Sequence, residues 1–285
     1  MKSAAVVSKP SKPELERIAP ELLEWFRRHE YQVWLDRETA AYASGYPVVE
    51  RDQIAAQHPD FVVVLGGDGT LLSAARAVAL AGIPILGVNL GSLGFLTEVP
   101  LDELYPTLEA LNENCCAVES RSMLHCNLIR GDHLMAHYDA LNDAVINKAA
   151  IARLASFDLF LDGAFVTNYK ADGLILSTPT GSTAYSLAAS GPILMPDADT
   201  FVVTPVCPHS LTHRPLVVRD RAAIEVRVRC TDDEVFLSID GQVGMPVRDG
   251  DRLRCRKSQH SVKLLRLSER NFFDVLRAKL KWGER

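Results

Sequence analysis

Short apolar runs alternate with helical patterns over roughly the first 118 residues. Apolar runs occupy residues 4–8, 31–35, 61–65 and 83–88, whereas residues 14–30 repeat their hydrophobic positions every three or four residues. This alternation favours parallel strands joined by crossover helices. The runs 61–65 and 83–88 are apolar throughout, as expected for strands that helices cover on both faces.

From about Arg121 the pattern changes to a period of two. In residues 223–230, apolar and charged side chains alternate, which is typical of an antiparallel strand with one solvated face. The last residues, 271–285, have the pattern of an amphipathic helix. Similar strand-like runs, several of them separated by Asp-Gly pairs suited to hairpins, lie at 157–163, 173–177, 201–206, 214–218, 234–241, 251–257 and 261–267. The chain is therefore predicted to have an α/β first part and a β-rich second part.

Composition and charge narrow the class of protein. The 285 residues are 47% hydrophobic and 24% charged, enough for one large or two modest cores. The net charge of -5 argues against a broad basic surface for nucleic acid or an anionic membrane. Six cysteines without a C-x-x-C pair indicate reduced thiols, and no apolar stretch suits a signal peptide or a membrane span. We expect a cytoplasmic protein with no membrane or nucleic-acid partner.

The segment VVVLGGDGTLLSAA, residues 62–75, places an acid in a loop suited to phosphate. A strand, a Gly-Gly-x-Gly turn and a helix continuing through 71–82 expose backbone N–H groups at the positive end of a helix dipole. The loop is not a Walker A motif, because no Gly-Lys-Ser/Thr follows. It is not G-x-G-x-x-G either, because Leu72 stands at the last glycine position.

The acid itself allows two interpretations. Asp68 or Thr70 could cap the predicted helix, since both residue types are good N-caps. Alternatively, the loop binds phosphate, and a carboxylate repelled by phosphate must then have another task. It could accept a proton from an attacking hydroxyl or hold Mg²⁺, and both tasks imply a kinase.

A second polar segment spans residues 170–196. Its strand-like run opens into a series of Ser and Thr residues followed by Tyr185, which offers hydrogen-bonding groups and an aromatic face for a base. A Ser/Thr-rich turn that caps a short helix has the same pattern. Upstream, Asn142 and Asp143 suit the two hydroxyls of a ribose, or form an ordinary Asx turn. His209 and His213 lack a clear third ligand, which disfavours a zinc site.

Together these motifs resemble the bacterial ATP-dependent NAD kinases. "GGDGT" alone is also found in lipid kinases, whereas the Ser/Thr-rich motif is highly specific. The matching motifs are GGDGT (66–70), NLGSLGFLTE (89–98), LNDAVI (141–146), ADGLILSTPTGSTAYS (171–186), PHSLTHRPLVV (208–218) and DGQ (240–242).

The resemblance implies a fold, a reaction and partners. It implies a Rossmann-like α/β domain over 1–120, a β-sandwich dinucleotide-binding domain over 121–268, and a C-terminal helix, 269–285, packing on the first domain. The implied reaction transfers the γ-phosphate of ATP, with Mg²⁺, to the 2′-hydroxyl of the adenosine ribose of NAD. Family members also suggest a homodimer or homotetramer.

The resemblance further assigns roles to residues, while metal ligands stay unassigned. Asp68 would be the general base, in a phosphate loop of Gly66, Gly67, Gly69 and Thr70. The expected NAD-binding set, in which Phe95 and Tyr185 flank the adenine, is Asp68, Gly69, Phe95, Asn142, Asp143, Arg153, Lys170, Asp172, Thr183, Ala184, Tyr185, Ser186, Leu187, Ala188 and Gln242.

Three positions depart from the family pattern. Asp143 is shorter than the frequent Glu, Ser190 replaces a frequent Gly, and Lys170 replaces a frequent Arg and loses its bidentate fork. We expect these departures to alter substrate affinity rather than the class of reaction.

Other functions would require sequence features that differ from those found. A lipid kinase with the same loop should show an acyl-chain entrance, which the Ser/Thr-rich segment does not favour. A non-catalytic NAD(P) sensor would be favoured by loss of Asp68 or a loop glycine, and all are present. A Rossmann oxidoreductase lacks its glycine fingerprint. The sequence does not distinguish NAD from NADH, or ATP from polyphosphate.

Overall fold

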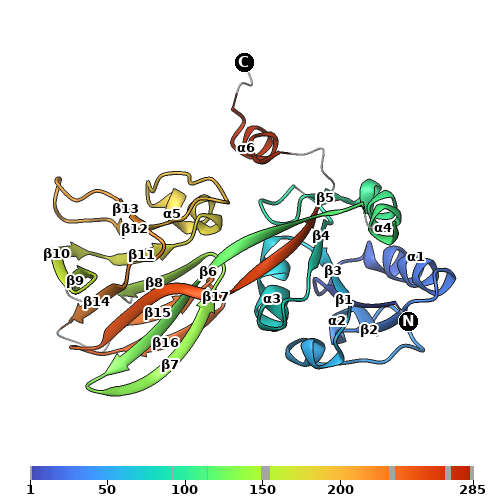
Figure 1. Cartoon of the computed structure of the whole chain (residues 1–285), viewed down its shortest axis with the longest axis horizontal. Coiled ribbons are helices and arrows are strands. Elements are labelled where there is room, and N and C mark those ends of the chain that lie inside the picture. The colour runs from blue at the N-terminus through green and yellow to red at the C-terminus, as the bar shows by residue number, and fades with distance from the viewer. Residues whose placement is uncertain are drawn as a thin grey trace. The chain divides into compact units, whose positions relative to one another are not determined.

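The structure is a computed structural model of the chain. It describes residues 2–91, 93–113, 115–148, 155–230, 235–266 and 271–282. The chain forms two compact units, which are Met1–Ser120 with His260–Arg285, and Arg121–Gln259 (Figure 1).

A parallel sheet forms the centre of the first unit. Its central strands, 3–8, 61–66 and 85–89, are almost wholly buried, as expected for a sheet that helices cover on both faces. At one side, Leu264 at the end of β17 (Arg252–Arg266) lies opposite Ile85. The order of the other strands is β2 (Gln32–Leu35), β1 (Ser3–Ser8), β3 (Phe61–Gly66), β4 (Ile85–Asn89) and β5 (Val99–Pro100).

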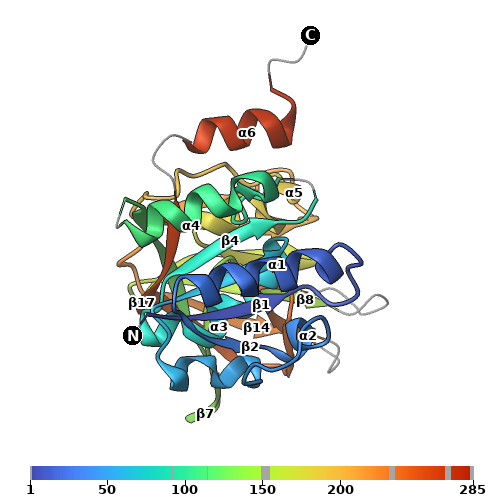
Figure 2. The same cartoon turned by 90° about the vertical axis from the view of Figure 1, so that its right-hand side faces the viewer.

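Helices cover the two faces of this sheet. Helices α1 (Leu15–Arg28) and α4 (Leu104–Asn112) share a core cluster with alternate strand residues such as Val63. Helix α3 (Asp68–Val78) lies on the other face (Figures 1 and 2). The shorter helical segments are α2 (Arg37–Ala40), η1 (Arg51–Gln57), η2 (Ala79–Ala81) and η3 (Leu101–Glu103). The strand order and the covering helices place the loop after β3 at the carboxyl edge of the sheet, where open α/β sheets bind ligands.

The second unit contains two antiparallel sheets. The first has the order β10 (Ala164–Ala171), β9 (Ala155–Leu161), β14 (Ile224–Arg229), β17, β6 (Ala117–Arg130) and β7 (His133–Ala140). The second has the order β13 (Leu216–Arg219), β12 (Thr200–Val206), β11 (Gly173–Ser177), β8 (Asp143–Lys148), β15 (Val235–Ile239) and β16 (Val243–Val247). Phe157 and Val226 of the first sheet and Leu176 and Phe201 of the second belong to one buried cluster, so the sheets pack as a sandwich.

The predicted fold class is confirmed, with an α/β part, a mostly antiparallel β part and a C-terminal helix, α6 (Phe272–Leu280). Two features differ from the expectation. The hairpin β6–β7 is absent from the sequence-based expectation, and the two runs expected within 251–267 are joined in the single strand β17, which spans Arg252–Arg266. Among the described helices, none has both the length and the apolar composition that crossing a bilayer requires.

Candidate active site

The glycine loop joins β3 to α3. Gly66 ends the strand, and Gly67 is the N-cap of the helix, accepting the N–H of Thr70 at 2.9 Å. A Cβ at Gly66 would lie 2.6 Å from Thr70 Oγ1, so packing requires a glycine there. A Cβ at Gly67 or Gly69 would meet no described atom within 4 Å. Packing therefore does not explain these two glycines, and their missing Cβ atoms leave the helix N-terminus open to close approach.

Asp68 does not cap the helix. The N-cap is Gly67, with no capping side chain, and the Asp68 carboxylate accepts hydrogen bonds from a distant segment instead. Its Oδ2 accepts the N–H of Phe95 at 2.9 Å. Its Oδ1 accepts the N–H groups of Leu96 and Thr97 at 3.1 and 3.0 Å and the Thr97 hydroxyl at 3.0 Å. Of the two interpretations of the acid, the capping one is therefore wrong for Asp68.

The two carboxylate oxygens of Asp68 accept different numbers of hydrogen bonds. Each carboxylate oxygen offers about two lone-pair positions. Within the described chain, three donors reach Oδ1 of Asp68, whereas one reaches Oδ2. Gly94 makes this approach possible, because a Cβ there would lie 2.0 Å from Oδ1. Oδ2 is thus the atom of Asp68 that can accept a further proton or hydroxyl.

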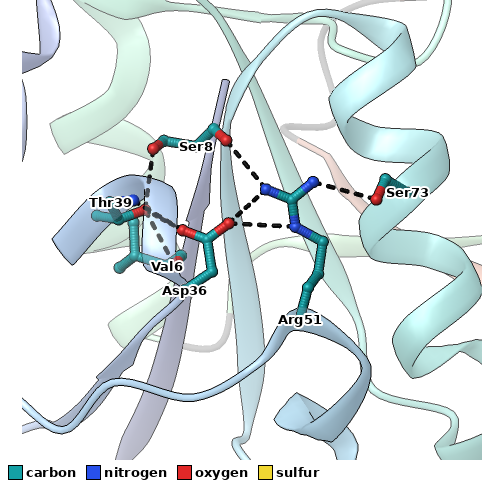
Figure 3. A network of polar contacts seen from close by, with 6 residues as sticks. All are labelled: Val6, Ser8, Asp36, Thr39, Arg51 and Ser73. Carbon is teal, nitrogen blue, oxygen red and sulfur yellow. Dashed lines mark hydrogen bonds and ion pairs between the residues drawn. The ribbon is translucent and has the colours of Figure 1, made fainter. Parts of the chain in front are cut away.

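A buried polar network fixes the helix that carries this loop (Figure 3). Arg51 at the start of η1 pairs with the buried Asp36 and donates to the Ser8 carbonyl at 3.2 Å and the Ser73 hydroxyl at 3.1 Å. Asp36 also accepts the N–H and the hydroxyl of Thr39 at 2.9 and 2.6 Å. Because Ser8 ends β1 and Ser73 lies on α3, the network ties α3 to the sheet.

In the second unit, the turn that holds Asn142 and Asp143 is bound from two sides. The Asp240 carboxylate accepts the N–H groups of Leu141, Asn142 and Asp143 at 3.1, 2.7 and 3.1 Å. Thr178, the residue after β11, donates its N–H to the Asn142 carbonyl at 2.9 Å and its hydroxyl to the Leu141 carbonyl at 2.5 Å. These bonds come from outside the turn, so it is not merely a local Asx turn.

Asp143 is buried, with 4% of its surface exposed. Burial, and secondly the charge of Asp240, raises the pKa of the Asp143 carboxyl to about 7. Near neutral pH this carboxyl therefore exists in both protonation states. Its protonated form can donate a hydrogen bond as well as accept one, which suits a ribose hydroxyl.

The hydroxyl groups of the Ser/Thr-rich segment bond mostly within the chain. Ser182 donates to the Pro179 carbonyl at 2.6 Å, and the buried Ser186 hydroxyl lies 2.9 Å from Thr204 Oγ1. The buried hydroxyl of Thr180 has no hydrogen-bond partner among the described residues. Thr183 ends η4 (Thr180–Thr183), Ala184 follows it, and Tyr185, Ser186, Leu187 and Ala188 form α5 (Tyr185–Ala188).

Tyr185 and Ser186 are neighbours in this segment, but their side chains differ in solvent exposure. Tyr185 is 40% exposed, so its ring is accessible to a base, whereas the Ser186 side chain points to the interior. Gly181 is required by packing, since a Cβ would lie 2.1 Å from the Asn142 carbonyl oxygen. The segment therefore combines an internal turn, as one interpretation held, with an accessible aromatic face.

Asp172 lies in a small charged cluster. Its Oδ1 is 2.7 Å from Lys148 Nζ and 3.4 Å from His209 Nε2. The hydrogen bond from Lys148 is the main cause that lowers the pKa of the Asp172 carboxyl. Lys170 is exposed on β10, and its carbonyl accepts the N–H of His209 at 2.8 Å. His213 packs edge-on against Tyr169.

The predicted set is completed by Gln242, Phe95 and Arg153. Gln242 is exposed in the β15–β16 hairpin. The ring of Phe95 is half-buried, with Lys279 Nζ of α6 lying 5.9 Å from its centroid. Arg153 lies outside the described residues. Sequence reasoning missed Asp240 as an organiser of the Asn142 turn, because the Asp-Gly pair indicates only a hairpin. It also missed Lys148, which no local pattern links to Asp172.

Comparison with known proteins shows the family of the chain. The model of the ATP-NAD kinase N-terminal domain matches residues 5–115, and that of the ATP-NAD kinase C-terminal domain matches residues 141–267. An NAD kinase of Koribacter versatilis is 61% identical and one of Acidobacterium capsulatum is 55% identical, each over 285 residues and the full length of both chains.

Solved structures show the same fold. Yeast NADH kinase complexed with NADH has a TM-score of 0.88 and 26% identity, covering 100% of this chain and 89% of that one. An NAD kinase from Archaeoglobus fulgidus in complex with ATP has a TM-score of 0.76 and 27% identity, covering 97% and 99%. The full-length identity to curated NAD kinases and the two matching domain models lead to one conclusion: this chain belongs to the ATP-NAD kinase family.

Proposed function

We propose that this NAD kinase transfers the γ-phosphate of ATP to the 2′-hydroxyl of the adenosine ribose of NAD, giving NADP and ADP. The observation that carries the proposal is Asp68, an acid in the first turn of a phosphate-loop helix with one carboxylate oxygen still able to accept a hydroxyl. The names of the full-length relatives support it. The ligands of the two solved structures, NADH and ATP, support the substrate classes.

Asp68 would act on the attacking hydroxyl. A ribose hydroxyl is a poor nucleophile near pH 7, and phosphoryl transfer is mainly a problem of alignment and charge neutralisation. Backbone N–H groups around Gly67 and Gly69 would bind phosphate oxygens at the positive end of α3. Oδ2 of Asp68 would then orient the 2′-hydroxyl and accept its proton, while the tethers on Oδ1 keep the carboxylate in place.

The dinucleotide would be held by the second unit. Asn142 and Asp143 would bind the ribose hydroxyls, and Phe95 and Tyr185 would flank the adenine. The pocket and the remaining polar contacts would come from Arg153, Lys170, Asp172, Thr183, Ala184, Ser186, Leu187, Ala188 and Gln242.

Magnesium would enter with the nucleotide. Among the described residues, no group of three or more His, Cys, Asp or Glu gathers to hold a metal ion. Mg²⁺ is commonly bound by one or two carboxylates together with substrate phosphates. The ion would therefore be held mainly by the phosphates of ATP, as Mg²⁺-ATP. When bound, the ion supplies neutralisation of phosphate charge.

We also propose the setting of the reaction. The protein would work in the cytoplasm as a homodimer or homotetramer, without a nucleic-acid or membrane partner. Residues 1–120 would form the phosphate-binding domain, 121–268 the dinucleotide-binding domain, and 269–285 a helix belonging to the first domain.

The test is formation of NADP from NAD and Mg²⁺-ATP, detected with an NADP-specific dehydrogenase. We expect Asp68→Asn to lower kcat by about 10²-fold or more, the scale of general base catalysis, with little change in the dissociation constant of NAD. Absence of NADP with the wild-type protein would overturn the proposed function, and near-normal kcat in a folded Asp68→Asn protein would overturn the role of Asp68.

A control separates catalysis from tethering, because Asp68 also binds the segment 95–97. Thr97→Val removes one donor to Oδ1 and leaves the carboxylate intact. We expect this variant to lose less than about tenfold in kcat, because Oδ2 and two backbone donors to Oδ1 remain. Melting temperatures of both variants show whether the loss of rate reflects loss of fold.

A further inference from the structure

The turn before β8 is held by one carboxylate. Asp240 lies in the hairpin between β15 and β16, and its two oxygens accept three successive backbone N–H groups, those of residues 141 to 143, at 2.7 to 3.1 Å. Its own N–H donates to the Asp143 carbonyl at 2.9 Å. Asp240 is 8% exposed, so these charge-assisted bonds are shielded from water.

The hairpin itself does not require this carboxylate. Asp162 precedes Gly163 in the β9–β10 hairpin, with φ angles of 49° and 83°, and Asp240 precedes Gly241 with φ angles of 51° and 64°. The two turns thus have the same left-handed backbone, which Asn adopts as readily as Asp. Asp162 accepts one backbone N–H, from Ala223 at 2.9 Å. The three bonds of Asp240 to the Asn142 turn go beyond what the hairpin needs.

We propose that Asp240 is a positioning residue for the dinucleotide: by fixing the backbone of residues 141 to 143, it sets the direction in which Asn142 and Asp143 meet the ribose. The inference rests on the proposed function. Asp240 acts through the turn and is not a catalytic residue. The opposite side of the same turn is held by Thr178, whose hydroxyl donates to the Leu141 carbonyl.

The substitution Asp240→Asn keeps the shape of the side chain but removes its ability to accept all three hydrogen bonds. A carboxamide has one acceptor oxygen, and its NH₂ group donates. Asn142 and Asp143 donate to Oδ1 of Asp240 and Leu141 donates to Oδ2, so whichever way the amide lies, at least one of the three N–H groups faces another donor. The turn loosens, and the side chains it presents lose their preorganised direction.

The experiment compares Asp240→Asn with the matched control Asp162→Asn in the full-length protein. We expect Asp240→Asn to raise the KM for NAD and the calorimetric dissociation constant of NAD by about tenfold or more. The KM for ATP should change by less than about twofold, because the turn meets only the dinucleotide in this proposal. Asp162→Asn should leave both KM values as in the wild type.

The outcomes are distinguishable. Equal effects of both variants on NAD binding, or no effect of Asp240→Asn while the wild type makes NADP, would overturn the positioning role alone. A wild type that neither binds nor phosphorylates NAD would overturn the proposed function and this inference together. Should Asp240→Asn not fold, Thr178→Val releases the same turn from its other side. A selective rise in the KM for NAD supports the inference, and an unchanged value contradicts it.

Discussion

At the scale of single residues, Asp143 couples stability to pH. Its pKa is about 7 in the folded protein, above the value near 3.8 of an exposed carboxyl. The folded state therefore holds this proton more tightly than the unfolded state. The stabilisation is fully present below about pH 4 and is lost as the pH rises through about 7.

We predict that Asp143→Asn removes this pH dependence. Relative to the variant, the wild type should lose up to about 4 kcal/mol in its free energy of unfolding between pH 4 and pH 8, at about 1.4 kcal/mol for each pKa unit. Chemical denaturation of both proteins at pH 5 and pH 8 measures the difference. An equal difference at the two pH values would show that Asp143 titrates normally.

The residue scale also shows where sequence reasoning succeeds and where it stops. Asp68 could be singled out because three glycines surround it within one short segment. The role of Asp240 could not be predicted from the sequence, since its hydrogen-bond partners lie 97 to 99 residues away in the chain. Ser190 was recognised as a departure from a family glycine. The structure gives the reason for that glycine, because Ser190 has a φ of 65° at the end of α5.

At the scale of elements, the Arg51 network joins strand β1 to helix α3. We predict that Arg51→Met lowers the free energy of unfolding by about 2 to 3 kcal/mol, because it leaves the buried Asp36 carboxylate without its cation. The control is the double variant Asp36→Asn/Arg51→Met, which carries no unpaired charge and should be more stable than Arg51→Met. Urea denaturation measures both, and equal stability of the two variants would contradict this account.

The long strands illustrate why element boundaries were predicted less well than element types. Strand β17 contains the segment RKSQHS, residues 256–261, which is polar on both faces and therefore lacks the alternation that indicates a strand. The boundary between the two compact units falls within this stretch. The apolar positions on either side, such as Leu253 and Leu264, are buried and were predicted correctly as parts of strands.

At the scale of the whole molecule, the second unit is one continuous stretch of chain, whereas the first unit is made of two separate stretches. The buried cluster of the second unit lies entirely within residues 121–259. We predict that this fragment, expressed alone, unfolds in one cooperative transition followed by circular dichroism. The matched fragment 1–120 lacks Leu264 and the buried Val275 and Leu276 of its own unit, and it should show no such transition. A non-cooperative fragment 121–259 would contradict the prediction.

The discontinuity of the first unit has a consequence for synthesis. The segment that follows Phe95 is secured late, because Glu98 pairs with Arg266, near the end of β17. A ribosome delivers the chain from its N-terminus, so residues 1–120 emerge well before Arg266, and this unit must wait for its last segment before its fold is complete. The half that would transfer phosphate is completed only once the last strand has emerged.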